Sequence, residues 1–187
     1  MVAGSILPIS FNKKNELCFL FGKENPMEDS AKGWSDFGGR LDKKETPFDA
    51  ALREGSEELT GFLGNKDELR KMIKKNGNCY TLTHETYHVH IFYMNYDENL
   101  PVYFNNNHLF LWNAMDKKML NDSKLFEKIE IDWFTEKQME SRKSEFRNFY
   151  QNIVSILLED GKIKKFAEKC RKKLGKKRKT QRKVNNV

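Results

Sequence analysis

The feature that most constrains this chain is a helix with clear start and stop signals that follows a glycine-rich turn. Thr46 is typical of a helix N-cap, Pro47 suits the first helical position, and Asp49 stands where an acid completes the cap. Thr60-Gly61 is typical of a helix end, so we expect the helix to run to about Leu59. A helix anchored at both ends presents a defined set of side chains on each face.

Three carboxylates share one face of this helix. Glu54, Glu57 and Glu58 stand at positions i, i+3 and i+4 and therefore project to the same side. Like charges this close repel one another, so they need either solvent or a hard cation. Carboxylate oxygens suit Mg²⁺ or Mn²⁺. An acidic triplet taken alone is more often a solvated face, and the pattern leaves both interpretations open.

The rest of the chain alternates predicted strands with predicted helices. A polar Asn-Lys-Lys-Asn turn joins the first two strands into a hairpin. Because strands and helices interleave, we expect an α/β sandwich around a mixed sheet. The strands are expected at residues 5–10, 16–22, 80–96 and 129–134, and a second helix at 67–75.

Two later segments complete the predicted organisation. We interpret residues 97–123 as an insertion with short strands at 102–104 and 109–112. Thr135 then suits the N-cap of a long helix, because the apolar residues after it repeat at helical spacing. These residues are Met139, Phe146, Phe149, Tyr150, Ile153, Ile156 and Leu157.

Positive charge is concentrated at the end of the chain. Residues 162–183 hold 13 Lys or Arg and one acid, whereas the rest of the chain has a net charge of −5. We therefore expect a folded domain at 1–161 and a basic tail at 162–187 that is first helical and then disordered. The tail is either a solubility or nuclear-localisation segment or a sequence-independent phosphate-binding arm.

Composition excludes several classes of protein. Hydrophobic residues make up 38% of the chain, which is enough for a core and excludes wholesale disorder. Cys18, Cys79 and Cys170 are odd in number and widely spaced, which favours a reducing compartment, cytoplasmic or nuclear, over a disulfide framework. The apolar runs are too short to span a bilayer, and residues 1–10 lack a basic signal-peptide start. We expect neither membrane insertion nor secretion.

The spacing of the helix and the turn before it carries a resemblance to a known family. The chain resembles the Nudix hydrolase superfamily, and the flanking hairpin and Trp133-Phe134 extend this resemblance over residues 3–158. Two positions depart from the family pattern: Gly55 replaces an apolar residue, and the glycine after the paired glutamates comes one place late, as Gly61. The matching positions are Gly39, Glu45, Arg53, Glu54, Glu57 and Glu58.

The resemblance implies a fold, a reaction and a set of site residues. The implied fold is an α/β/α sandwich, and the implied reaction is metal-dependent hydrolysis of a nucleoside diphosphate linked to another group. Arg53 and Glu45 are then a structural pair beside Gly39. The Mg²⁺ or Mn²⁺ ligands are the Gly38 carbonyl, Glu54, Glu57 and Glu58, the last two also being catalytic.

Family members often carry a further acid outside this segment, as general base or extra ligand. The candidates here are Glu127 and Glu130, and we prefer Glu127 because Glu130 can point outward from its strand. Trp34, Phe37 and Arg40 are candidate substrate-binding residues beside the turn.

Histidines and further aromatic residues offer weaker signals. His84, His88 and His90 lie close together, but a zinc site needs a fourth ligand and only Cys79 is near in sequence. We interpret these histidines as ordinary packed or surface residues. The aromatic residues of 104–112 can stack on a base or belong to the core.

Three functions remain open because the six matching positions do not define the leaving group of the reaction. The first is removal of the 5′ cap from RNA, which the basic tail favours; the Lys- and Asn-rich composition is compatible with the Nudix enzymes of large DNA viruses. The second is hydrolysis of a nucleotide sugar, dinucleoside polyphosphate, nucleoside triphosphate or inositol pyrophosphate. The third is a non-catalytic RNA-binding module, which the complete acidic triplet disfavours. Dimers are common in the family, but the sequence does not establish one.

Overall fold

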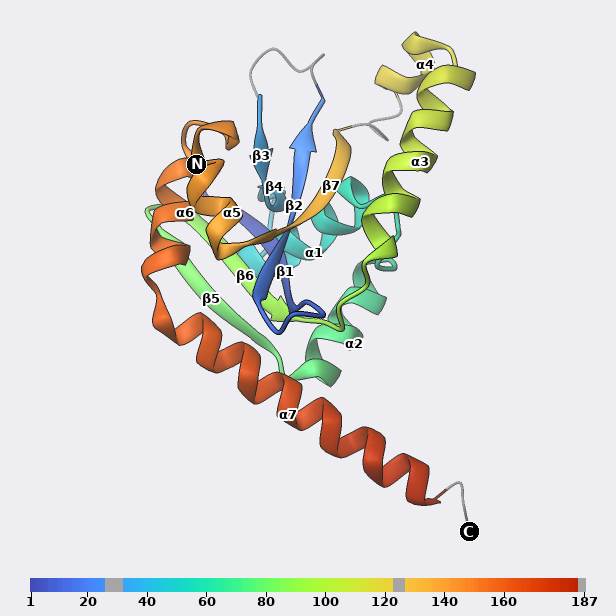
Figure 1. The fold of residues 1–187 in the computed structure, drawn as a ribbon. Helices are drawn as coiled ribbons and strands as arrows, with labels where there is room; N and C mark the ends of the chain where they lie inside the picture. Colours follow the sequence, from blue (N-terminus) through green and yellow to red (C-terminus); the bar gives the residue numbers. More distant parts are fainter. Residues whose placement is uncertain (26–31, 123–126, 185–187) are drawn as a thin grey trace.

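A mixed seven-stranded sheet lies between two layers of helices in the computed structural model, which describes residues 1–25, 32–122 and 127–184 (Figure 1). The order of the main strands is β3-β2-β1-β6-β5; β4 also pairs with β1, and β7 pairs with β2. Only the pairing of β1 with β6 is parallel among those of the described strands. The strands are β1 (Ala3–Phe11), β2 (Leu17–Glu24), β3 (Trp34–Ser35), β4 (Phe37–Arg40), β5 (Cys79–His84), β6 (Tyr87–Tyr93) and β7 (Lys128–Thr135).

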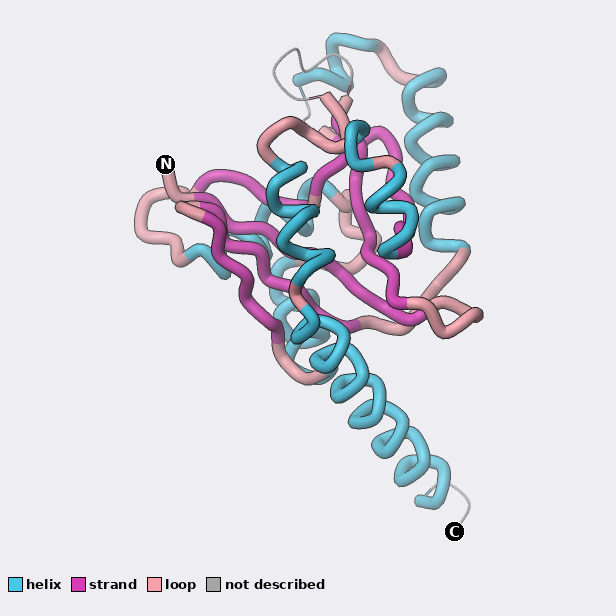
Figure 2. The backbone as a smooth tube through the Cα atoms, turned by 60° about the vertical axis from the view of Figure 1, so that its left-hand side comes forward, coloured by secondary structure: helices cyan, strands magenta, loops and turns pink. Residues whose placement is uncertain are grey.

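Each face of the sheet has its own hydrophobic core. Leu17, Phe19 and Phe21 of β2 face one cluster, whereas Cys18 and Leu20 face the other, as strand alternation requires. Figure 2 shows the helices on both sides of the strands, so the predicted α/β/α sandwich is confirmed. One cluster packs under α1 (Pro47–Glu58), α2 (Lys66–Asn76) and α3 (Asn99–Ala114), and the other under α5 (Glu136–Ser141), α6 (Tyr150–Glu159) and α7 (Gly161–Val184).

Several local predictions are confirmed. The first hairpin forms as β1 and β2, and Thr46 caps α1 by accepting a hydrogen bond from the Asp49 backbone nitrogen at 3.1 Å. Helix α1 ends at Glu58, with Leu59 as its C-cap. The strand region 80–96 divides into β5 and β6, because the chain turns at Glu85, which has a φ of 53°.

The predicted strands at 102–104 and 109–112 are wrong, because this segment forms helix α3, followed by α4 (Lys117–Asp122). Leu100, Phe104 and His108 recur every four residues and form a buried stripe against the body. The asparagine run is no turn: the Asn105 side chain donates to the Ile131 carbonyl at 3.2 Å and accepts from its nitrogen at 2.8 Å. Burial of this stripe and the bonds of Asn105 to β7 therefore favour a helix, although the composition of the segment is typical of strands.

The long helix predicted after Thr135 is also wrong. Thr135 caps only α5, which is followed by a 3-10 turn, η1 (Lys143–Glu145), before α6 begins at Tyr150. Between these helices the chain lies against β3: Phe146 bridges to Trp34, and the Arg147 nitrogen donates to the Trp34 carbonyl at 3.1 Å. Pairing with the sheet interrupts a helix that the apolar spacing alone favours.

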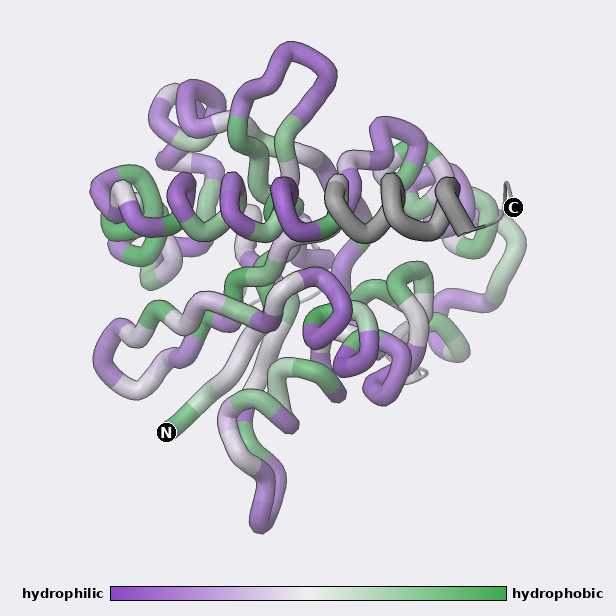
Figure 3. The backbone as a smooth tube through the Cα atoms, turned by 90° about the horizontal axis from the view of Figure 1, so that it is seen from below, coloured by the Kyte–Doolittle hydropathy of each residue, from purple (hydrophilic) through white to green (hydrophobic). Residues whose placement is uncertain are grey.

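The basic C-terminal segment begins inside the core. Ile163, Ala167 and Cys170 of α7 are buried in the same cluster as the residues of α6. Between them, the Lys and Arg side chains at 162–173 are exposed, and the described turns of α7 alternate between hydrophobic and hydrophilic residues (Figure 3). The predicted disordered end includes residues 185–187, which lie outside the described residues. All three cysteines are free, and the described helices include none with the length and apolar character that a membrane span requires.

Two glycines let α1 approach β1 closely. A side chain at Gly4 would overlap the Pro47 carbonyl, and one at Gly55 would overlap the buried Ile6 side chain. The departure from the family pattern at Gly55 is thus compensated by close packing of helix against strand.

We predict that Gly55→Ala destabilises the protein, although alanine favours helices. Overlap with Ile6 should lower the free energy of unfolding by about 1–3 kcal/mol, measured by urea denaturation. Gly175→Ala in α7 is the matched control, because no atom lies within 4 Å of its added methyl group. It should be neutral or stabilising by up to about 1 kcal/mol. Equal effects of the two substitutions would contradict the packing argument.

Candidate active site

The Gly38-Gly39 segment, predicted as a turn, is instead part of strand β4 and pairs with β1, and the carboxylates of α1 lie against it. Glu58 Oε2 accepts a hydrogen bond from the Gly38 nitrogen at 2.8 Å. A side chain at Gly39 would lie 2.5 Å from the Glu54 carboxylate, and one at Gly38 would overlap Ser5. The absence of side chains at these two positions of β4 therefore lets two carboxylates of α1 sit directly on its backbone.

Arg53 clamps strand β4 to helix α1. Its Nε donates to Glu45 Oε1 at 3.1 Å and one terminal nitrogen donates to Glu45 Oε2 at 2.9 Å, which makes the pair bidentate. The same side chain donates to the Arg40 carbonyl at 3.1 Å and to Glu54 Oε1 at 2.7 Å. Hydrogen bonds with Glu45 raise the pKa of Arg53 above its ordinary value, so the clamp stays charged. Glu57 lies at the rim, 61% exposed, with Oε2 3.7 Å from Arg53.

A buried lysine joins Glu58 to the sheet. Lys128 is the first residue of β7 and is 1% exposed. Its Nζ contacts Glu24 at the end of β2, donates to Ser35 Oγ at 2.8 Å, and lies 3.5 Å from Glu58 Oε1. Arg147 donates to the same Glu24 oxygen at 2.9 Å. Both oxygens of Glu58 are thus engaged by the protein, one by Gly38 and the other by Lys128.

Electrostatics keep this lysine charged. Burial by itself lowers the pKa of Lys128, but the carboxylates of Glu58 and Glu24 outweigh it and raise the pKa above the ordinary value. Burial raises the pKa of Glu58 well above its usual range, and the Lys128 ammonium opposes that shift.

Sequence reasoning missed Lys128, Glu24 and the buried Asp36. Asp36 accepts hydrogen bonds from Ser5 Oγ and the Tyr87 hydroxyl, each at 2.5 Å, and burial raises its pKa to about 6. Their residue types are common on surfaces, so the sequence carried no signal for them beyond the position of Lys128 next to Glu127.

The two candidate acids outside α1 are in different surroundings. The carbonyl of Glu127 accepts from the Asn25 nitrogen at 3.0 Å, and its charge is close enough to raise the pKa of Glu58. Glu130 instead pairs with Lys23 at 3.2 Å on the exposed face of β2 and β7. Glu127 directly precedes Lys128, which contacts Glu58, whereas Glu130 is paired with Lys23.

Two of the three candidate substrate-binding residues are in the core. Trp34 is 2% exposed and packs edge-on against Phe134, with ring centroids 4.8 Å apart. Phe37 is fully buried in the other cluster. Neither ring offers a face to a substrate, so burial corrects the stacking prediction for both. Arg40 is exposed at the end of β4.

The histidines form no metal centre. His90 is buried, with Nδ1 3.1 Å from Thr81 Oγ1, and desolvation lowers its pKa to about 4. His88 has the same kind of contact with Thr83 at 3.1 Å. Throughout the described part of the chain, no three His, Cys, Asp or Glu side chains are gathered as metal ligands. In α1, Glu54 is bonded by Arg53, and Glu58 is contacted by Lys128 and Gly38.

The match to known proteins agrees with this geometry. A family model described as the NUDIX domain matches residues 3–154. The chain belongs to the Nudix family. It is a hydrolase that acts on pyrophosphate bonds, and the family implies a nucleotide-type substrate. The resemblance carried by residues 39–58 is therefore confirmed.

Similar solved structures include two remote ones. The Ap4A hydrolase of C. elegans is 15% identical, with a TM-score of 0.46 over 84% of this chain and 94% of that chain. A mutT/nudix family protein from Listeria innocua is also 15% identical, with a TM-score of 0.43 over 82% of this chain and 88% of that chain. No curated protein sequence matches significantly.

Nudix hydrolases generally use divalent metal ions, and the residues of this site suit them in chemistry. The donors are oxygens only, and the Gly38-Gly39 backbone leaves room for the carboxylates of Glu54 and Glu58 beside it. Glu57 is exposed enough to reorient toward an ion.

We predict that Lys128→Met strongly destabilises the protein. Removal of one member of a buried ion pair should cost about 3–5 kcal/mol in the free energy of unfolding, measured by urea denaturation. Adding Glu58→Gln should recover part of the loss, because Glu58 then has no charged partner, whereas Glu24 keeps Arg147. Lys23→Met breaks the exposed pair with Glu130 and should cost less than about 1 kcal/mol. A loss no larger than that of this control would contradict the role assigned to Lys128.

Proposed function

We propose that this protein is an Mg²⁺- or Mn²⁺-dependent pyrophosphohydrolase that cleaves a nucleoside diphosphate from a linked group. The observation that carries the proposal is the acidic face of α1, held against Gly38 and Gly39 of β4 by Arg53 and Glu45. Glu54, Glu57, Glu58 and the Gly38 carbonyl would hold the metal. When bound, the metal neutralises diphosphate charge and lowers the pKa of a water molecule.

The residues of the chain have separate roles in this proposal. Arg53 positions β4 and Glu54, and Lys128 positions Glu58. Glu127 accepts the proton of the attacking water. The water oxygen forms a new bond to phosphorus while the bridging P–O bond breaks, and the bridging oxygen leaves with the other phosphate. The place of Glu127 next to Lys128, which contacts Glu58, supports its choice over Glu130 as the base.

We predict that Glu57→Gln and Glu127→Gln each lower kcat by at least about 100-fold without unfolding the chain. The reason is that each removes a charge from the reacting region. The measurement is turnover with saturating Mg²⁺, alongside a thermal melt of each variant. Glu130→Gln is the matched control and should retain turnover, because its carboxylate pairs with Lys23. A near-normal rate for Glu57→Gln would refute the metal assignment.

The substrate that we propose is the 5′ cap of RNA. The end of β2 and the start of β7, which carry Glu24 and Lys128, lie at the top of Figure 1, whereas α7 leaves the body at the bottom. A small substrate held at the acidic face of α1 cannot also contact the distant cationic helix α7, but a polymer can contact both. The placement of α7 thus favours capped RNA over a small nucleotide, which remains the competing candidate.

We predict that the protein releases the cap nucleoside as its diphosphate from RNA labelled in its 5′ cap. It should cut the free cap dinucleotide far more slowly. The measurement is product analysis after incubation with Mg²⁺ and each substrate in parallel. The preference should shrink as salt rises, because phosphate contacts weaken with ionic strength. If both compounds are cut equally, the RNA portion contributes nothing. If neither is cut, the small-molecule candidates take its place.

The contribution of the tail is best tested without deleting it from residue 162. Ile163, Ala167 and Cys170 belong to the core, so such a deletion also removes packing. Charge-neutralising substitutions at exposed lysines of α7 separate phosphate binding from folding.

A further inference from the structure

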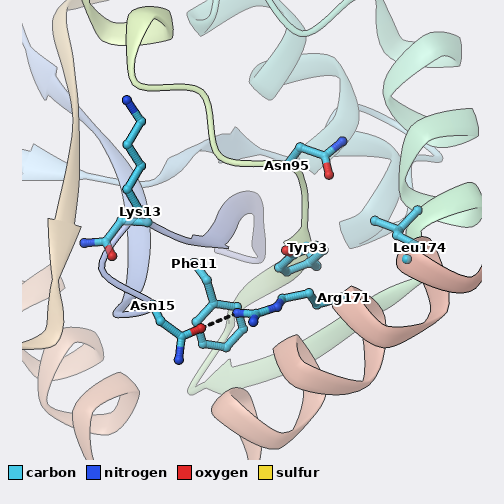
Figure 4. Close-up of a pocket in the computed structure, with 9 residues that line it drawn as sticks. Phe11, Lys13, Asn15, Tyr93, Asn95, Arg171 and Leu174 are labelled. Carbon is cyan, nitrogen blue, oxygen red and sulfur yellow. Dashed lines mark hydrogen bonds between the residues drawn. The ribbon is translucent and has the colours of Figure 1, made fainter. Parts of the chain in front are cut away.

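Three neighbouring cavities follow the end of the sheet where α7 passes the β1–β2 turn. The first, of about 490 Å³, lies between that turn, β6 and α7 (Figure 4). It shares Phe11, Asn15 and Arg171 with a second cavity of about 490 Å³, and Asn95 with a third of about 600 Å³ beside α2. Because lining residues are shared, we treat the three cavities as one surface and call it the α7 groove.

The α7 groove is cationic although the rest of the body is net acidic. Each of its three cavities is lined by at least two Lys or Arg side chains and by no more than one acid. The cations come from three separate elements, so one phosphate group cannot contact them all. The lining cations are Lys13, Lys71, Lys75, Lys164, Arg171 and Lys172, and the lining acids are Asp97 and Glu168.

The floor of the groove has a fixed arginine and amide groups. The Arg171 guanidinium lies 4.8 Å from the centre of the Phe11 ring and donates to Asn15 Oδ1 at 2.5 Å (Figure 4). These contacts hold Arg171 at the groove. Asn15 and Asn95 are exposed, and their amides can bond the base edges that only an unpaired strand presents. Lys13 contacts Glu98 at 2.5 Å, but the pair is exposed and a phosphate can replace it.

We propose that the α7 groove binds single-stranded RNA, with lysines of α2, the β1–β2 turn and α7 on its phosphates. The identity of the polymer rests on the proposed function, in which an RNA chain extends from the catalytic site. The spread of cations along a groove fits a flexible polyanion, and the exposed amide groups fit unpaired bases. The groove lies at the end of the sheet where α7 leaves the body, so it contributes binding without touching the reacting phosphates.

The test is RNA binding in the absence of turnover. The full-length protein is titrated, in EDTA, into a 3′-labelled uncapped RNA of about 12 nucleotides, with anisotropy as the readout. A variant with Lys13, Lys71 and Lys172 all changed to Gln removes one cation from each cavity. It should bind at least about 10-fold more weakly at moderate salt, and its salt slope should fall by about 2. An unchanged affinity and slope would overturn the proposal.

Two comparisons separate this groove from general charge attraction. A control variant changes three exposed lysines elsewhere, Lys43, Lys118 and Lys137, to Gln and should retain binding. An equal loss of RNA affinity in the two variants would overturn the assignment of binding to the α7 groove. A blunt RNA duplex and poly-glutamate should bind more weakly than the single strand, and equal binding overturns the assignment to unpaired RNA. Because the assay needs neither metal nor cap, its failure leaves the hydrolase activity untouched, and an inactive enzyme that still binds leaves the groove intact.

Discussion

A single buried ammonium group joins the elements that build the candidate active site. Lys128 at the start of β7 meets Glu24 at the end of β2 and Glu58 at the end of α1, in surroundings where an unpaired charge is very costly. Strand, strand and helix must therefore arrive together for any of them to be stable there. The orientation of Glu58 follows from this requirement, so the site depends on the assembly of the sheet as much as on α1 itself.

Close approach of backbone to backbone supplies the second constraint. Gly4 and Gly55 let α1 lie directly on β1, and Gly38 and Gly39 leave room for the carboxylates that α1 presents. Through one rigid guanidinium, Arg53 then links β4, its own helix α1 and the loop that precedes α1. Few side chains contribute to this arrangement, and each has more than one contact, which explains how a short segment can carry both structure and chemistry.

The sequence predicted the parts of this molecule that local rules determine. The cap at Thr46, the spacing of the three glutamates and the hairpin depend on neighbours in the chain, and they are present as expected. It could not reveal Lys128, because burial of a lysine depends on partners more than 60 residues away in sequence. Helix α3 and the break before α6 were missed for the same reason: Asn105 bonds to Ile131, and Arg147 to Trp34, across the fold. Trp34 and Phe37 lie in strands β3 and β4 beside the predicted site, but their side chains are buried in the core.

Helix α3 has a consequence for how this protein behaves among other copies of itself. Strand β7 borders the sheet beyond β2, and such a border ordinarily offers free amide and carbonyl groups to a strand from another molecule. Asn105 occupies that position at Ile131 with one donor and one acceptor, as a partner strand would. Helix α3 thereby hinders the addition of a strand from another molecule at Ile131, in the strand whose first residue pairs with α1.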